Sequence, residues 1–467
     1  MKTAALNNKD ILSYKLRFEA EHYLNDNSFL CLALERNKDN CDTLENLATV
    51  FNPPVFKRQF CKPTSKSVQY FQSSDVQNAE EFSPVHIFKG QAESLNLLVN
   101  KGDVLVTGFG TIGNTRLVSK HQDGVCYANN VCRIRTNSNI PNGFIYAFMT
   151  SKYGYAQLNN NASGSVVRYI EAPGIKRTLV PRVPESFQKE VDDLIQESAR
   201  LREEATVALN KASELLKQYA SLSDLTESDY DYYGPHSSER KVSYFIRSRK
   251  EIDSTTINAF NHSERIRNTK DKIKCKTKPL KEIILNGDTF STGSFPRVEV
   301  KEGKGIMLIN QSDIFDSIIK GKYISKRNVK LSNLVEYGEV LIAGVGTMGE
   351  NETFCRTIFA NEDLVGQLVS GEFIRMKTND KVPSGYLYTW LSSDYGFRLI
   401  RNLQTGTKLC RPIPRLVLEI PVPIIETEQM VEIDKLVKEA HSKKYRANCL
   451  ERKAILMVEQ EIEKWNN

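Results

Sequence analysis

Patterns typical of a disulfide framework, a zinc site or a membrane span are missing from this sequence. The nine cysteines are widely scattered and form no Cys-x-x-Cys pair, and Cys126 and Cys132 have no histidine at metal-ligand spacing. The longest apolar region, residues 412–425, is interrupted by Arg415, Glu419 and four prolines, so it is unfit to span a bilayer. The first ten residues open no apolar run of the kind that a secretory signal needs. We therefore expect a soluble intracellular protein with reduced thiols, no metal and no membrane contact.

Patterns that would mark an active site are also missing. The six histidines stand in unrelated contexts, and the sequence contains neither a Gly-x-x-x-x-Gly-Lys-Ser/Thr phosphate loop nor a nuclease-type Asp…Glu-x-Lys core. Asn52-Pro-Pro-Val55 is similar to the Asn-Pro-Pro-aromatic motif of enzymes that methylate exocyclic amines, but Val55 replaces the aromatic residue. We expect a turn at this position. We also expect a chain that is not an enzyme and that holds no cofactor.

Length, composition and net charge place only broad limits on the number of domains and on the kind of partner. A chain of 467 residues has room for roughly two to four domains. Its 40% hydrophobic and 26% charged residues are ordinary for a soluble protein. The net charge of +7 permits a polyanionic partner without requiring one.

The most informative feature that is present is a long internal repeat. Residues 102–113, Gly-Asp-Val-Leu-Val-Thr-Gly-Phe-Gly-Thr-Ile-Gly, return at 338–349 as Gly-Glu-Val-Leu-Ile-Ala-Gly-Val-Gly-Thr-Met-Gly. Three neighbouring landmarks recur in the same order, at separations between 236 and 242 residues. They are Phe56-Lys-Arg58 with Phe295-Pro-Arg297, Ser74-Asp-Val76 with Ser312-Asp-Ile314, and Pro141-Asn-Gly-Phe-Ile-Tyr146 plus Tyr153-Gly154 with Pro383-Ser-Gly-Tyr-Leu-Tyr388 plus Tyr395-Gly396. A period this long exceeds the roughly 20–50 residues of solenoid repeats, so it indicates two duplicated domains.

Each half combines a β-rich block with one long helix. Runs such as Val104–Thr107, Arg116–Val118 and Val131–Arg135 predict short strands, and residues 144–159 predict a helix. A heptad seam without Gly or Pro then predicts a long helix, and a similar stripe follows Pro421-Val-Pro423. The seam residues are Val191, Leu194, Leu201, Ala205, Ala208, Ala212 and Leu215 in the first helix, and Ile433, Val437 and Ala440 in the second. We expect these helices to pack on each other or on partner helices.

These patterns predict an α+β fold with five segments. The first globular domain covers residues 1–184 and the first helix 185–222. A polar linker at 223–240 leads to the second globular domain at 241–424 and the second helix at 425–467.

The repeated glycines admit two interpretations. Gly108, Gly110, Thr111 and Gly113, and likewise Gly344, Gly346, Thr347 and Gly349, fit the Gly-x-Gly-x-x-Gly pattern of dinucleotide-binding turns. In that motif the glycines open a helix, whereas residues 114–119 have the pattern of another strand. We therefore favour a glycine-rich turn between two strands, which still allows a phosphate or base edge to approach the backbone closely.

Basic residues recur at matching places in both halves. Because Lys and Arg neutralise phosphates and Arg reads base edges, we take them as candidate DNA contacts. The candidates are Lys57, Arg58, Arg116, Arg168, Lys176 and Arg177 in the first half, and Arg297, Lys408, Arg411 and Arg415 in the second. A further stretch, residues 265–281, carries eight basic residues and one acidic residue.

The order of these motifs resembles the specificity (S) subunit of type I restriction–modification systems. The resemblance covers essentially the whole chain, and the opening phrase Leu16-Arg-Phe-Glu-Ala-Glu-His-Tyr23 contributes to it. The counterpart of this phrase near Lys250-Glu-Ile-Asp253 is weaker.

The resemblance implies that each globular block is a target-recognition domain that reads one half of a bipartite, asymmetric site in double-stranded DNA. It implies that the two helices pack antiparallel as a coiled-coil spacer. Two modification subunits that bind S-adenosylmethionine and methylate adenine would dock on this chain, and translocating restriction subunits would join the full complex. The chain itself would be non-catalytic and would reside in the prokaryotic cytoplasm.

Two other functions stay open at this point. The chain could be a nucleotide-dependent enzyme that uses the paired glycine-rich turns, or an adaptor that uses its two helices only to dock other proteins.

Overall fold

The computed structural model describes residues 26–79, 81–164, 168–234, 242–252, 255–350 and 352–466. Contacts divide the chain into two compact units: unit 1 comprises residues 1–203 and 446–467, and unit 2 comprises residues 204–445. The phrase Leu16–Tyr23 lies outside the described residues. Short strands and helices alternate in both units, so the prediction of a mixed helix-and-strand fold with two long helices is confirmed.

Unit 1 contains two four-stranded sheets. One has the order β2-β9-β6-β7 with antiparallel neighbours throughout, and the other has the order β3-β5-β4-β8, in which β8 runs parallel to β4. A separate antiparallel pair joins β1 to β10. The strands are β1 (Cys41–Thr43), β2 (Ala48–Phe51), β3 (Phe60–Cys61), β4 (Ser67–Phe71), β5 (His86–Phe88), β6 (Val104–Thr107), β7 (Thr115–Leu117), β8 (Cys126–Tyr127), β9 (Val131–Thr136) and β10 (Leu179–Pro181).

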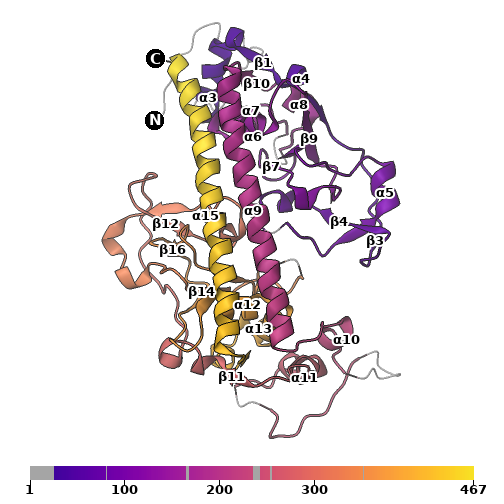
Figure 1. The fold of residues 1–467 in the computed structure, drawn as a ribbon, viewed down its shortest axis with the longest axis vertical. Coiled ribbons are helices and arrows are strands. Elements are labelled where there is room, and N and C mark those ends of the chain that lie inside the picture. The colour runs from indigo at the N-terminus through magenta and orange to yellow at the C-terminus, as the bar shows by residue number, and fades with distance from the viewer. Residues whose placement is uncertain are drawn as a thin grey trace. The chain divides into compact units, whose positions relative to one another are not determined.

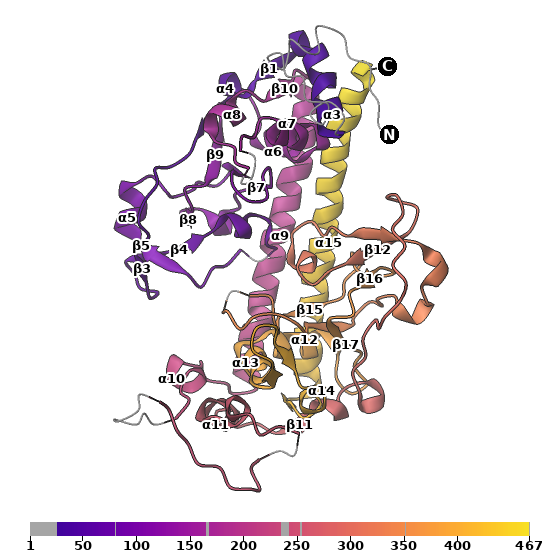
Figure 2. The same ribbon diagram turned by 180° about the vertical axis from the view of Figure 1, so that it is seen from behind.

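Unit 2 repeats this strand pairing. Its central strand β14 pairs with β15 and β17 as β6 pairs with β7 and β9, and β12 pairs antiparallel with β13 and parallel with β16 as β4 pairs with β5 and β8. Figure 2 shows β12 and β16 on one side of unit 2 and the helices α10 and α11 on another. The strands are β11 (Thr277–Pro279), β12 (Ile306–Ile309), β13 (Lys322–Ile324), β14 (Val340–Ala343), β15 (Thr357–Phe359), β16 (Leu368–Val369), β17 (Phe373–Met376), β18 (Gln404–Thr405), β19 (Arg411–Pro412) and β20 (Pro421–Pro423).

Each unit also contains short helices, three of which correspond between the units. In unit 1 they are α3 (Asp26–Arg36), α4 (Leu44–Leu47), α5 (Lys89–Ser94), α6 (Asn142–Thr150), α7 (Lys152–Asn160) and α8 (Ala172–Lys176). In unit 2 they are α10 (Glu227–Tyr230), α11 (Glu264–Asp271), α12 (Ser384–Ser392), α13 (Asp394–Asn402) and α14 (Pro414–Val417). The pair α6–α7 matches α12–α13, and α8 matches α14 in its Pro near the N-terminus.

The single helix expected over residues 144–159 is wrong, because Ser151 interrupts it. Ser151 has extended backbone angles, and its Oγ accepts a hydrogen bond from Gly154 N, which caps α7. Gly154 then lies so close to α6 that a Cβ would be 2.3 Å from Phe148 O. Ser393 and Gly396 repeat this arrangement between α12 and α13. The corner therefore depends on a Ser cap and a Gly that together let two short helices meet.

The two long helices are α9 (Glu185–Tyr219) and α15 (Thr427–Glu463), drawn in magenta and yellow in Figure 1. Within unit 1, the Ser198 hydroxyl donates to Ala447 O at 2.9 Å. Within unit 2, Lys443 pairs with Glu204 at 3.2 Å, and the Tyr219 hydroxyl donates to Glu432 at 2.8 Å. The helices thus contact each other inside each unit. Within unit 2 they run antiparallel, because partner numbers rise on α9 while they fall on α15.

The ten seam residues lie mostly in the interior. Leu194 and Ala208 are half-buried, and the other eight are buried. Val191 belongs to the apolar core of unit 1 together with Ala454, Val458 and Ile462 of α15, while Ala212, Leu215, Ile433 and Val437 belong to the core of unit 2. Each core is therefore built partly from both long helices.

In each unit, one long helix is approached closely by a glycine of a short helix. Gly143 N, in α6, donates to Asp192 Oδ1 of α9 at 2.8 Å. Gly385 N, in α12, donates to Asp434 Oδ1 of α15 at the same distance. A Cβ on either glycine would lie within 2.4–2.7 Å of the carboxylate oxygen, so only glycine permits this approach.

Candidate nucleic-acid interface

The first glycine-rich segment is a hairpin turn between β6 and β7. Thr107 N donates to Asn114 O at 2.9 Å, and Gly113 N donates to Thr107 O at 3.1 Å. Gly110 and Gly113 adopt positive φ angles of 76° and 87°, which favour glycine. The segment leads into a strand rather than a helix, as the favoured interpretation of the sequence predicted.

The second glycine-rich segment joins β14 to β15 over a longer path. Ala343 N donates to Arg356 O at 2.9 Å, and Cys355 N donates to Ala343 O at 2.8 Å. Neither turn opens a helix, so neither presents the helix N-terminus on which a dinucleotide pyrophosphate rests. The nucleotide-dependent alternative therefore receives no support from this geometry.

In unit 1 the turn meets the basic segment that includes Arg168. Ile170 N donates to Gly108 O at 2.8 Å, and Phe109 forms a bridge with Tyr169. The rings of Phe109 and Tyr169 stack at 5.5 Å and remain partly exposed. A Cβ on Gly108 would lie 2.5 Å from Ile170 O, which explains the glycine. Arg168 is exposed beside this stack and donates to Asn159 O.

Unit 2 brings the corresponding segments together. Gly346 and Cys410 exchange two backbone hydrogen bonds, of 3.2 and 2.7 Å. Lys408 and Arg411 flank Cys410 and are exposed, as is the apolar side chain of Leu409. In both units, two segments that are about 60 residues apart in the sequence thus form one surface of glycine backbone and basic side chains. We call it the turn surface: Gly108–Gly113 with Arg168–Ile170, and Gly344–Gly349 with Lys408–Arg411.

A helix anchors each turn from behind. In unit 1, Asn159 of α7 donates to Ile112 O at 3.5 Å. In unit 2, Arg401 of α13 occupies the matching place and donates to Met348 O. The anchor is neutral in one unit and cationic in the other.

The cationic anchor of unit 2 includes a carboxylate. Arg398 forms hydrogen bonds of 2.7 and 2.8 Å to Glu350, and Arg401 lies 3.6 Å from it. Burial acts to raise the pKa of Glu350, but the hydrogen bond from Arg398 and the nearby charges of Arg401 and Arg356 outweigh it and lower that pKa. The end of the second turn is therefore held by an ionic cluster that unit 1 lacks among its described residues.

The mixed sheets carry the other predicted basic residues. In unit 1, Lys57 and Arg58 are exposed just before β3, and the Arg58 guanidinium lies 5.7 Å from the Tyr70 ring. In unit 2, Arg297 is exposed next to Val298, whose carbonyl accepts from Ser325 N at 2.8 Å. Arg297 thereby lies beside the chain that follows β13.

A basic run in unit 2 was missed by the sequence analysis. Residues 317–335 contain five basic residues and no acidic one: Lys320, Lys322, Lys326, Arg327 and Lys330. All five are exposed, and of these only Lys322 forms an ion pair in the described structure, with Glu299. A count of basic and acidic residues in a window moved along the sequence would have found this run. Together with Arg297 we call it the basic edge of unit 2.

Arg116 was wrongly predicted to be a DNA contact. It is buried, and its guanidinium donates to Gln122 Oε1, to the carbonyls of Val76 and Asn78, and to Glu81 at 3.2 Å. Those bonds occupy every nitrogen of the guanidinium. Arg116 therefore holds unit 1 together and is unavailable to a ligand.

Two further buried arginines occupy equivalent positions on β9 and β17. Arg133 pairs in register with Leu105, and Arg375 with Leu341. Arg133 donates only to backbone carbonyls, and burial lowers its pKa to about 10. Arg375 instead forms a bidentate pair with the buried Glu339. Arg375 binds the loop before β14, whereas Arg133 binds mainly carbonyls of residues 127–131 and, in the loop before β6, Leu97 O. Both roles are structural, and a count of charges does not reveal them.

Lys176, Arg177 and Arg415 lie on or next to the matching short helices α8 and α14. Arg177 and Arg415 are exposed and Lys176 is half-buried. At the first residue of α8, Ala172 N donates to Asn52 Oδ1 at 2.8 Å, and Asn52 Nδ2 donates to Asn129 O at 3.2 Å. The Asn52 side chain is thus held by backbone groups, and the segment that follows it has an irregular backbone rather than the turn expected there.

Half of the eight basic residues in the stretch 265–281 are engaged within the protein, and one of these, Arg267, lies 3.9 Å from Asp271. Arg265 is buried with its guanidinium 3.7 Å from the centre of the Phe260 ring, Lys272 pairs with Asp229 at 2.7 Å, and Lys281 pairs with Glu419 at 2.7 Å. This stretch is not a continuous free cationic surface.

Within the described ranges, no group of three or more His, Cys, Asp or Glu side chains is placed to hold a metal ion. None of the helices described is both long enough and apolar enough to cross a membrane.

Of the comparisons with known proteins, the one with solved structures found matches. No family model and no curated protein matches the sequence. Among solved structures, the chain is similar to a type I restriction–modification S subunit from M. genitalium, with 11% identity, a TM-score of 0.36, and coverage of 91% of this chain and 95% of that one. It is similar to the HsdS subunit from Thermoanaerobacter tengcongensis, with 14% identity, a TM-score of 0.28, and coverage of 90% and 95%. A third is a chain from a structure described as the complex assembly and conformational transition of the type I R-M system, with 16% identity, a TM-score of 0.28, and coverage of 90% and 97%.

Proposed function

We propose that this chain is the DNA-sequence-recognition subunit of a type I restriction–modification complex. The observation that carries the proposal is the duplicated turn surface. Both units place a glycine-rich turn against an exposed basic segment and anchor it from a helix. Two such surfaces in one chain suit two acts of recognition on one extended target.

The two turn surfaces differ where base readout would occur. Unit 1 offers Phe109, Tyr169 and Arg168, whereas unit 2 offers Lys408, Leu409 and Arg411. Different donors and apolar groups read different base edges in the major groove. The two units would therefore recognise unlike half-sites, so the complete site would be asymmetric.

The mixed sheets would supply phosphate contacts. Lys57 and Arg58 in unit 1, and the basic edge in unit 2, are exposed and largely without carboxylate partners among the described residues. Contacts to phosphates carry most of the salt-dependent affinity for DNA and set the register of the protein on the duplex.

The long helices would set the spacing between half-sites as an antiparallel coiled coil. A helix of 35 residues is about 52 Å long, which exceeds one turn of DNA at about 34 Å. The exposed faces of α9 and α15 would dock two adenine methyltransferase subunits. Methyl transfer and S-adenosylmethionine binding would belong to those subunits, and restriction subunits would join them, leaving this chain without a catalytic residue.

Neutralising the basic edge tests the proposed DNA contact. The variant combines Arg297→Gln, Lys326→Gln and Arg327→Gln, assembled with the methyltransferase subunits. If all three side chains neutralise phosphates, the slope of log affinity against log salt should fall by about 0.9 for each substituted residue. Fluorescence anisotropy at several salt concentrations measures it, with exposed Lys381→Gln as the control. An unchanged slope in the triple variant would remove the basic edge from the DNA interface.

Shortening the spacer tests the role of the helices. Deleting seven residues from both α9 and α15 removes about 10 Å, or about three base pairs. The spacer of the preferred site should shorten while both half-site sequences stay the same, which methylation of a library with variable spacers can measure. Altered half-sites with an unchanged spacer would contradict the proposal.

A further inference from the structure

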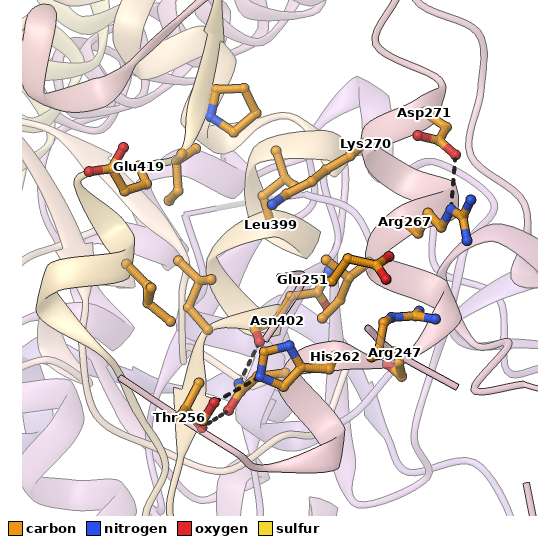
Figure 3. Close-up of a pocket in the computed structure, with 17 residues that line it drawn as sticks. Arg247, Glu251, Thr256, His262, Arg267, Lys270, Asp271, Leu399, Asn402 and Glu419 are labelled. Atoms are coloured by element: carbon orange, nitrogen blue, oxygen red, sulfur yellow. Dashed lines mark hydrogen bonds and ion pairs between the residues drawn. The ribbon is translucent and has the colours of Figure 1, made fainter. Parts of the chain in front are cut away.

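Unit 2 contains a cavity of about 450 Å³ that is separate from the turn surface. It lies between α11, the irregular chain before α11, and the segments that follow α13 (Figure 3). Its volume falls within the range of roughly 300–1,000 Å³ typical of small-molecule sites.

One wall of the cavity is apolar. Leu399 and Leu403 contribute to it from α13 and the residue that follows it, and Leu416, Ile420 and Pro421 from α14 and the chain leading to β20. An apolar wall of this kind favours a hydrocarbon or aromatic body that removes it from water.

The opposite wall is charged, and most of its charges are already matched. The Arg247 guanidinium donates to Glu264 at 2.8 Å, and Arg267 lies 3.9 Å from Asp271. On the other side, Glu419 lies between Leu416 and Ile420 and accepts at 2.7 Å from Lys281, which does not line the cavity. The remaining carboxylate, Glu251, accepts from Ser248 N at 2.9 Å, and its pKa is lowered by its hydrogen bonds to Ser248 and by the charges of Arg247 and Arg267.

Lys270 is the exception on this wall. Figure 3 shows its side chain extending across the cavity toward Leu399. The Lys270 ammonium forms no hydrogen bond or ion pair with the residues that the structure describes. The surrounding protein removes part of the water around the Lys270 ammonium, which lowers its pKa, and no carboxylate offsets this. The Lys270 side chain is nevertheless exposed to solvent, so an entering anion can reach it beside the apolar wall.

The remaining polar groups at the cavity are satisfied within the protein. Asn261 Nδ2 donates to the carbonyls of Asn402 and Gln404, and its Oδ1 accepts from the Thr256 hydroxyl. His262 Nε2 donates to Thr256 O at 2.9 Å. They shape the floor of the cavity and leave Lys270 as its main unpaired donor.

We propose that this cavity binds a small amphiphilic monoanion, with one carboxylate on an aliphatic or aromatic body. Lys270 pairs with the carboxylate, and the wall of Leu399, Leu403 and Leu416 covers the body. This inference does not depend on the proposed DNA function, because the cavity lies apart from the turn surface and from the basic edge.

Calorimetric titration of the full chain with 4-phenylbutyrate tests the site. The wild type should bind one equivalent saturably, whereas acetate, which lacks the apolar body, should not saturate. Lys270→Met should weaken binding about tenfold or more, the size of a charge-assisted hydrogen bond, and Lys270→Arg should retain it within a few-fold. Exposed Lys274→Met, three residues beyond α11, is the matched control and should bind as the wild type does.

A second variant locates the ligand independently of charge. Leu416→Trp should fill part of the cavity and weaken 4-phenylbutyrate binding without unfolding the chain, which circular dichroism checks. Absence of saturable binding to the wild type would overturn the proposal. So would equal affinity for the neutral 4-phenylbutan-1-ol, or an equal loss in Lys274→Met.

Discussion

Substituting Gly143 with alanine should loosen the attachment of α6 to α9. The added Cβ would lie 2.4 Å from Asp192 Oδ1 and 3.1 Å from Ile195 Cβ, both on α9. Either the helices separate or Asp192 moves, and in both cases the 2.8 Å hydrogen bond from Gly143 N to Asp192 is broken.

The expected loss of stability follows from the steric overlap of the new Cβ and from the broken hydrogen bond. Overpacking of this kind costs about 1–3 kcal/mol, and a hydrogen bond to a charged group contributes about 1.5–3 kcal/mol. Because one movement causes both losses, they do not add fully. We expect the free energy of unfolding to fall by about 2–4 kcal/mol, or a urea midpoint lower by about 1–2 M.

The two tryptophans allow each unit to be followed separately. Trp465 packs against the core of unit 1, and Trp390 is buried in the core of unit 2. In a Trp390→Phe background, urea unfolding followed by Trp465 emission reports on Gly143→Ala. The matched control is Gly90→Ala, since a Cβ at Gly90 meets nothing within 4 Å. That change should leave stability unaltered or raise it by up to about 1 kcal/mol.

The equivalent glycine-to-alanine substitution in unit 2 repeats this test independently. Gly385→Ala would place a Cβ 2.7 Å from Asp434 Oδ1 and should destabilise unit 2, read from Trp390 in a Trp465→Phe background. If Gly143→Ala unfolds at the same urea concentration as Gly90→Ala, close approach of α6 to α9 is not what holds this interface, and the reasoning fails.

Three further predictions concern buried charges. Burial, reinforced by the charge of Asp313, raises the pKa of Asp316 to about 6, so its ionised form is disfavoured in the folded state. The folded protein loses no stability from this carboxyl below its ordinary pKa of 3.8, and the loss grows as the pH rises through 6. The Asp316→Asn variant should therefore unfold at a higher urea concentration than the wild type at pH 7.5, but not at pH 4. Arg375→Met should lower the free energy of unfolding by about 3–5 kcal/mol because Glu339 is left buried and unpaired, and adding Glu339→Leu should restore part of it in the same assay. Arg116→Met should destabilise the chain while leaving the salt dependence of DNA affinity unchanged in the assembled complex; a changed slope would return Arg116 to the DNA interface.

Local sequence patterns were sufficient for the long helices and for the turns. A heptad stripe without Gly or Pro can bury its apolar face only as a helix, and α9 begins at the predicted Glu185. The glycine-rich segments were identified as turns between strands because the residues after the first of them, 114–119, have a strand pattern. These conclusions needed only the period of side chains along the backbone.

The sequence pattern gave wrong predictions where the position of a residue depends on a partner from a distant segment of the chain. The corner at Ser151 depends on the close approach of Gly154 to α6, and the apolar run across it concealed the break. Arg116 and Arg168 have the same formal charge in the sequence. Glu81 and three other partners bury the first, whereas the second stays exposed beside Tyr169.

The sequence by itself therefore determined the duplication, the two long helices and the strand-to-strand turns, because each follows from spacing along one segment. Only the tertiary structure decided which cations are structural, which form the turn surfaces and the basic edge, and that Lys270 faces an apolar cavity. The physical reason is that burial and charge pairing depend on groups that come together from distant parts of the chain. The spacing of side chains within one segment does not specify the distance between such groups.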